Sequence, residues 1–183
     1  RDYNPDQEDG DGDGTGDPCD TDPVLLVSQD PGDAPDFFTI IAAVAGAVES
    51  GTRVRILPGT VPYFGQVTID RNMLIHFEGV DDGLGTPVEV DGGGGAAFEF
   101  LSTAGTANTL VRGLSIEGSP GVRAHVPVTV RDCFFHDNAV SALELFSDGH
   151  RIDRIQVDET SNRGIWLREL AEVEVTHSRF VGM

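Results

Sequence analysis

The chain has no lysine, only two cysteines and a single tryptophan among its 183 residues. Its 12 basic residues are all arginine, against 31 acidic residues and a formal net charge of -19. Nucleic acids and anionic lipid surfaces bind to positively charged proteins, so this balance argues against both as partners. Two cysteines are too few for a disulfide scaffold. No apolar run reaches the roughly 18 residues that a membrane-spanning helix requires.

The negative charge is concentrated at the N-terminus. Residues 1–36 contain 12 acidic residues and one arginine, which is more than half of the net charge of the chain. The rest of the sequence has the composition of an ordinary domain. Because the chain opens with Arg-Asp-Tyr and stops after the strand-like RFVGM, we interpret it as a fragment of a longer protein, with its fold truncated at the C-terminal end.

The stretch DGDGDGTGDPCD, residues 9–20, has an aspartate at every second position of its first half. Carboxylates this close repel one another unless a cation lies between them. Calcium takes six to eight oxygen ligands, and the spacing matches a 12-residue calcium loop with Gly14 at the sharp turn. A solvated, disordered acidic linker is the alternative. The predicted ligands of a Ca²⁺ cofactor are Asp9, Asp11, Asp13, Thr15, Asp17 and Asp20.

Residues 4–20, NPDQEDGDGDGTGDPCD, closely resemble a thrombospondin type 3 repeat. The resemblance implies an extracellular, helix-free arm that wraps calcium, and it places a first domain at residues 1–22. In that family the cysteine usually bonds to one in a neighbouring repeat, which leaves the partner of Cys19 open. A dockerin-type loop is less consistent with the sequence, because Asp22-Pro23 and the apolar run VLLV follow where a helix would be needed.

Residues 39–50 have the spacing of a helix that would cover one end of the second domain, residues 23–183. Thr39 is the predicted N-cap and Gly51 the predicted C-cap. The apolar residues at helical spacing are Phe38, Ile41, Val44, Ala45 and Val48.

After this helix, short apolar segments repeat about every 22 residues. One series begins at Val111, Val130, Ile152 and Val175, and a second series is centred on Phe98, Val122, Leu143 and Ile165. Such a period is one turn of a parallel β-helix, in which stacked coils bury a continuous core. The sequence therefore predicts an all-β solenoid, with three inward ladders that include Val111 to Val175, Leu114 to Ser178 and Ile116 to Phe180.

The segment VSQDPGDAPDFFTIIAAVAGAVESGTRVRILPGTVPYFGQVTI, residues 27–69, resembles the start of right-handed parallel β-helix proteins of the pectin lyase-like superfamily. The resemblance extends over residues 24–183. It implies a right-handed coil, and it connects the chain with lyases, hydrolases, esterases, adhesins and non-catalytic stalks. The methylesterase signature G-N-x-D-F-I-F-G is absent from the sequence.

The repeat alignment places polar residues in shared columns. His136 and Asp158 fall in one column, and Asp132, Arg154 and His177 fall in another. The candidate catalytic residues are Asp132, Arg154, His136 and Asp158, although such columns also occur on solvated turns. Trp166 is a candidate for stacking on a sugar ring. Its position also fits the alternation of side chains in a β-strand, which would make it an ordinary strand residue. Cys133 is expected to be buried on an inward ladder.

Two functions follow as hypotheses. The first is a secreted or cell-surface calcium-binding protein whose β-helix is a non-catalytic surface, adhesion or glycan-binding module. The second is a secreted polysaccharide-active enzyme, either a pectate or pectin lyase or a carbohydrate esterase.

Overall fold

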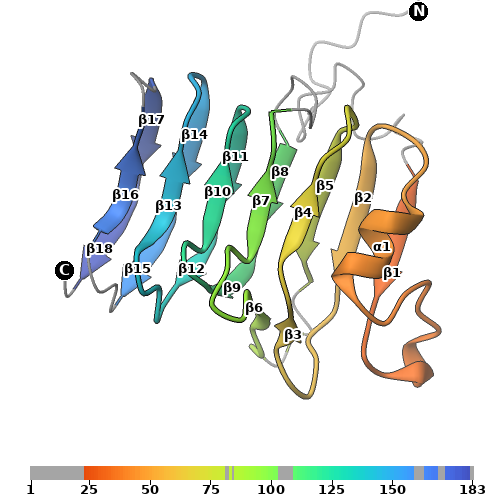
Figure 1. Ribbon diagram of the computed structural model, residues 1–183. Helices are drawn as coiled ribbons and strands as arrows, with labels where there is room; N and C mark the ends of the chain where they lie inside the picture. Colours follow the sequence, from red (N-terminus) through yellow and green to blue (C-terminus); the bar gives the residue numbers. More distant parts are fainter. Residues whose placement is uncertain are drawn as a thin grey trace, which may run out of the picture.

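A computed structural model describes residues 23–80, 83, 85–102, 109–158, 163–168 and 172–181. The predicted calcium loop at residues 9–20 lies outside these residues. In the described part, parallel strands form a β-solenoid of about 5 turns with a period of about 23 residues, accompanied by one α-helix (Figure 1). The predicted all-β solenoid is therefore confirmed.

The strands belong to three parallel sheets, and from β2 onward the chain visits the sheets in a fixed cyclic order. Sheet 1 contains β1 (Val24–Val27), β2 (Thr52–Ile56), β5 (Ile75–Gly79), β8 (Thr109–Arg112), β11 (Val128–Arg131), β14 (His150–Asp153) and β17 (Val173–Thr176). Sheet 2 contains β3 (Tyr63–Phe64), β6 (Val88–Asp91), β9 (Leu114–Glu117), β12 (Phe134–Phe135), β15 (Gln156–Asp158) and β18 (Arg179–Val181). Sheet 3 contains β4 (Val67–Ile69), β7 (Phe98–Phe100), β10 (Val122–Ala124), β13 (Ser141–Leu145) and β16 (Arg163–Leu167).

The strand registers confirm two of the three predicted ladders, those that begin at Val111 and Ile116. Val130 pairs with Val111 and with Ile152, and Ile152 pairs with Val175. In sheet 2, Ile116, Phe135, Val157 and Phe180 pair in succession. In sheet 3, Phe98, Val122, Leu143 and Ile165 do the same. Side chains alternate between the two faces of a strand, so these apolar positions point into the solenoid and most of them form its core. In the last coil, Val175 is 44% exposed.

The core of the early coils is aromatic. The rings of Phe77 and Phe98, from sheets 1 and 3, have centroids 5.0 Å apart, and Phe100 packs 6.3 Å from Phe77. All three side chains are fully buried. The coil between Phe77 and Val111, which are register partners, is longer than the others.

The helix is shorter than predicted. Helix α1 spans Ile40–Gly46, with Thr39 as the N-cap, whose Oγ1 accepts a hydrogen bond from the backbone of Ala42 over 3.1 Å. The predicted C-cap is wrong, because Gly51 lies in the turn before β2 with a φ of 88°. The helix ends at Gly46, where any side chain would clash with the ring of Phe37.

The buried face of α1 also differs from the predicted one. Ile40, Ala43 and Val44 are buried, as is Ala47 just beyond the helix, whereas Phe38, Ile41 and Val48 are exposed. The start at Ile40 sets this face, since residues three and four apart share one side of a helix. Helix α1 packs against β1, β2 and β4 and so lies at the N-terminal end of the solenoid (Figure 1).

At the N-terminal end of the solenoid, neighbouring segments of the chain cover more than one sheet. The backbone amides of Asp36 and Phe37 donate to the carbonyl oxygen of Leu26 on β1, over 2.9 and 3.1 Å. The Gln29 amide bonds to the backbone of Val61, just before β3. These contacts satisfy edge groups that would otherwise be free to pair with another chain. Among the described residues, no helix is long and apolar enough to cross a membrane.

Candidate functional site

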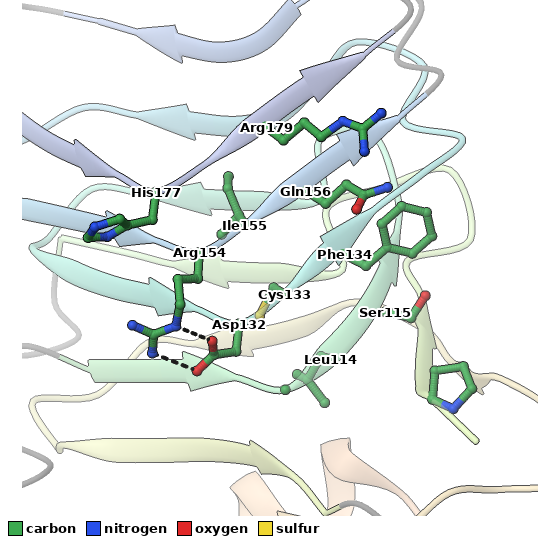
Figure 2. A pocket seen from close by; sticks show the side chains of 12 residues that line it. Leu114, Ser115, Asp132, Cys133, Phe134, Arg154, Ile155, Gln156, His177 and Arg179 are labelled. Atoms are coloured by element: carbon green, nitrogen blue, oxygen red, sulfur yellow. Dashed lines mark hydrogen bonds and ion pairs between the residues drawn. The ribbon is translucent and has the colours of Figure 1, made fainter. Parts of the chain in front are cut away.

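A groove of about 700 Å³ runs along the solenoid where the chain turns from sheet 1 to sheet 2. Two columns of outward residues border it, and the buried ladder of Leu114, Cys133 and Ile155 lies between them (Figure 2). The residues that line the groove are Pro87, Gly113, Leu114, Ser115, Asp132, Cys133, Phe134, Arg154, Ile155, Gln156, His177 and Arg179.

The first column consists of the turn residues Gly113, Asp132, Arg154 and His177. All four have a positive φ, of 67°, 53°, 50° and 47°. The backbone amide of each of the first three donates to a carbonyl oxygen in the next coil, over 3.1 to 3.2 Å. Because the same turn recurs in these four successive coils, the side chains at these positions are brought next to one another. The predicted column of Asp132, Arg154 and His177 is therefore confirmed.

The charged groups of this column are paired. Arg154 donates to both carboxylate oxygens of Asp132, over 2.6 and 3.0 Å, as the dashed lines in Figure 2 show. It also donates to Asp153 over 2.5 Å. Hydrogen bonds from His177 and Thr176 lower the pKa of Asp153, and the hydrogen bond to Asp132 raises the pKa of Arg154. These hydrogen bonds stabilise the charged forms of both groups, so Arg154 stays protonated and is poorly suited to remove a proton from a substrate.

The second column consists of the outward residues of sheet 2 that are register partners, Ser115, Phe134, Gln156 and Arg179. Phe134 is an aromatic ring with 37% of its surface exposed. No hydrogen bond or ion pair of the Arg179 guanidinium is found among the described residues. The column thus offers a hydroxyl, an apolar ring, an amide and a cation along one side of the groove (Figure 2).

His136 does not approach the first column but bonds to the second. Its Nε2 lies 3.0 Å from Oγ of Ser115, and its Nδ1 lies 3.0 Å from Oδ2 of Asp137. The ring also stacks on Phe134, with centroids 5.2 Å apart. Asp137 sits in a turn with a φ of 51°. The repeat alignment pointed to His136 as a candidate but not to its hydrogen-bond partner Ser115.

Asp158 occupies the same column as His136, because the residues before them, Phe135 and Val157, are register partners. Its Oδ2 accepts a hydrogen bond from Gln156 over 2.7 Å. The four candidate catalytic residues therefore form two separate groups. Asp132 and Arg154 lie on one side of the groove, and His136 and Asp158 lie beyond the other.

The other predicted residues have structural roles. Cys133 is buried, and burial raises the pKa of its thiol to about 12. Trp166 is covered by two guanidinium groups, since Arg168 lies 3.7 Å and Arg163 lies 4.2 Å from its ring centroid. Its ring is therefore occupied by cation–π contacts.

No cluster of three or more metal-ligating side chains is present in the described ranges. Near His136, the pKa of Glu117 is raised by burial and then by the charge of Asp91. Burial is the larger cause of this shift, and the neighbouring carboxylate of Asp91 adds to it.

Comparison of the chain with known protein families, with curated proteins and with solved structures finds no match.

Proposed function

We propose that the chain is part of a secreted or cell-surface calcium-binding protein whose β-solenoid binds a glycan in the groove between sheets 1 and 2. The observation that supports this function is the composition of the second column. An exposed aromatic ring, an amide and a guanidinium with no partner among the described residues lie in line across successive coils, which are about 4.8 Å apart. Such a mixture of apolar surface and a few placed polar groups is typical of small-molecule and carbohydrate sites.

The first column favours binding over lyase chemistry. A lyase needs a base that is unprotonated near neutral pH and can accept a proton from the substrate. Asp132 and Arg154 are instead bonded to one another in a bidentate pair, which stabilises both charges. We therefore assign this column to the wall of the groove and place no proton transfer there. The calcium loop, whose predicted ligands include Asp11 and Asp13, would extend this module as a cation-ordered arm.

The test is a binding screen of the purified chain against immobilised polysaccharides. Phe134→Ala and Arg179→Ala each remove one contact of the groove and are expected to weaken binding about tenfold. Arg151→Ala is the matched control, because Arg151 is an exposed arginine of sheet 1, with a side chain 69% exposed and a long 3.9 Å ion pair to Glu174. Binding that all three variants retain equally would exclude the groove as the site.

A further inference from the structure

The hydrogen bonds around His136 have the connectivity of a serine hydrolase triad. Ser115 Oγ lies 3.0 Å from Nε2 and Asp137 Oδ2 lies 3.0 Å from Nδ1. A carboxylate at Nδ1 keeps the proton on that nitrogen, so Nε2 has a free lone pair directed at the serine hydroxyl. Nucleophile, base and orienting acid are thus joined in the order that acyl transfer requires.

The fold holds these three groups in place. Ser115 is an outward residue of β9 and is only 4% exposed, yet it lines the groove. His136 follows β12 in the next coil and is braced by the ring of Phe134. The left-handed turn at Asp137 places the carboxylate beside the imidazole that precedes it. The serine therefore faces the space in which we place the glycan, and the histidine approaches it from the adjacent coil.

We propose that Ser115, His136 and Asp137 form a second functional site that hydrolyses esters. The choice of substrate rests on the proposed function: the ester would be an acyl group on a hydroxyl of the bound glycan. Ser115 Oγ attacks the ester carbonyl carbon while its proton passes to Nε2 of His136. The carbon–oxygen bond to the sugar then breaks, and His136 returns the proton to the departing sugar oxygen.

Water completes the reaction. It attacks the acyl-serine carbonyl, gives one proton to Nε2 of His136, and displaces Ser115 Oγ, which takes that proton back. The products are a carboxylic acid and the free sugar hydroxyl, so one ester and one water are consumed. Asp137 does not exchange a proton in this sequence. It is a positioning residue that holds the imidazole tautomer.

A second serine–histidine pair in the chain provides a matched control. Ser147 Oγ lies 3.0 Å from Nε2 of His150. Here, however, Nδ1 of His150 accepts a hydrogen bond from the backbone amide of Val128 over 3.3 Å. The proton must then lie on Nε2, which donates to Ser147 and cannot remove its proton. Ser147 is therefore expected to be unreactive.

The experiment measures hydrolysis of p-nitrophenyl acetate by the full chain, together with mass-spectrometric labelling by a serine-directed fluorophosphonate. The unmodified chain is expected to hydrolyse the ester and to be labelled once, on Ser115. Ser115→Ala should abolish labelling, and His136→Gln should lower the rate at least about 100-fold. Ser147→Ala should leave both unchanged. Asp137→Asn should lower kcat with little change in KM, which distinguishes a positioning role from a loss of binding.

Each possible result decides the proposal. Hydrolysis that persists in Ser115→Ala, or no hydrolysis by a chain with the circular dichroism of a folded β-protein, would overturn the esterase site. The small ester does not depend on glycan binding, so this outcome is separate from the polysaccharide screen. If Ser115→Ala still binds a polysaccharide but no longer cleaves esters, both proposals stand. If ester cleavage is observed and no glycan binds, only the assignment of the substrate fails.

Discussion

Arg154 donates hydrogen bonds to both carboxylate oxygens of Asp132, although the two residues lie 22 positions apart in the sequence. They meet because each occupies the same left-handed turn in successive coils. The pair therefore depends on a left-handed backbone at both of its members. Aspartate tolerates this conformation better than most L-residues, whereas for Arg154 it is unfavourable.

This relationship leads to a prediction at position 132. Asp132→Gly and Asp132→Ala both remove the carboxylate, but glycine adopts a φ of 53° without strain. We expect the glycine variant to be more stable than the alanine variant by about 1 kcal/mol. The measurement is the free energy of unfolding from denaturant titration.

Asp153 is the control for this comparison, because it is the last residue of strand β14 and is not among the residues with a positive φ. At position 153 the order of stabilities should reverse. The glycine variant should be less stable than the alanine variant, since glycine weakens a strand. The same order at both positions would contradict the argument from the turn.

Because His150 is buried, we expect the folded chain to lose stability at mildly acidic pH. Burial lowers the pKa of this histidine below its ordinary value of 6.5, and its Nδ1 accepts a backbone hydrogen bond that a protonated ring cannot accept. Just below pH 6.5, His150 becomes protonated in the unfolded chain but stays neutral in the folded chain. The contribution of His150 to the free energy of unfolding is thus complete above pH 6.5. It declines as the pH falls toward the lower pKa that His150 has in the folded chain.

The measurement is the unfolding free energy of the unmodified chain and of His150→Gln between pH 8 and pH 5. The nearby Asp148 raises the pKa of His150 and so narrows the pH range over which stability is lost, but burial has the larger effect on this pKa. We expect the unmodified chain to lose more stability over this range than the variant does. Two parallel curves would show that His150 does not titrate in this way.

The acidic loop predicts calcium binding by the N-terminal segment. In a calorimetric titration the full chain should bind calcium saturably, with an affinity of about 10⁻⁴ to 10⁻³ M, as in extracellular modules. Replacing Asp11 and Asp13 together by alanine should abolish this binding. Replacing Asp2 and Asp6 removes the same charge outside the loop and should preserve it. Equal loss in both double variants would indicate a diffuse attraction to acidic charge in place of a site.

Much of the fold was predictable because its core repeats. Val111, Val130, Ile152 and Val175 could be aligned from the sequence, and they are register partners in the structure. The helix was predicted less well, because its apolar residues gave two possible faces and the sequence did not show that Gly46 packs against Phe37. The handedness of the coil and the calcium arm stay predictions.

The site was predictable in part. The column of Asp132, Arg154 and His177 followed from the repeat, because turn residues recur at the same spacing as the core. The contact between Ser115 and His136 did not follow, although the same alignment would have placed Ser115 and Phe134 side by side. Outward positions tolerate most polar residues, so nothing in the sequence marked this serine as different from a solvated one.

The sequence by itself determined which residues point inward, because every coil must bury apolar side chains directly over those of the coil before it. That constraint repeats along the chain and leaves a visible period. The tertiary structure alone decided which outward groups touch. A hydrogen bond from Ser115 to His136 needs the distance and direction between two coils, and these depend on turn geometry and strand register, which residue spacing does not encode.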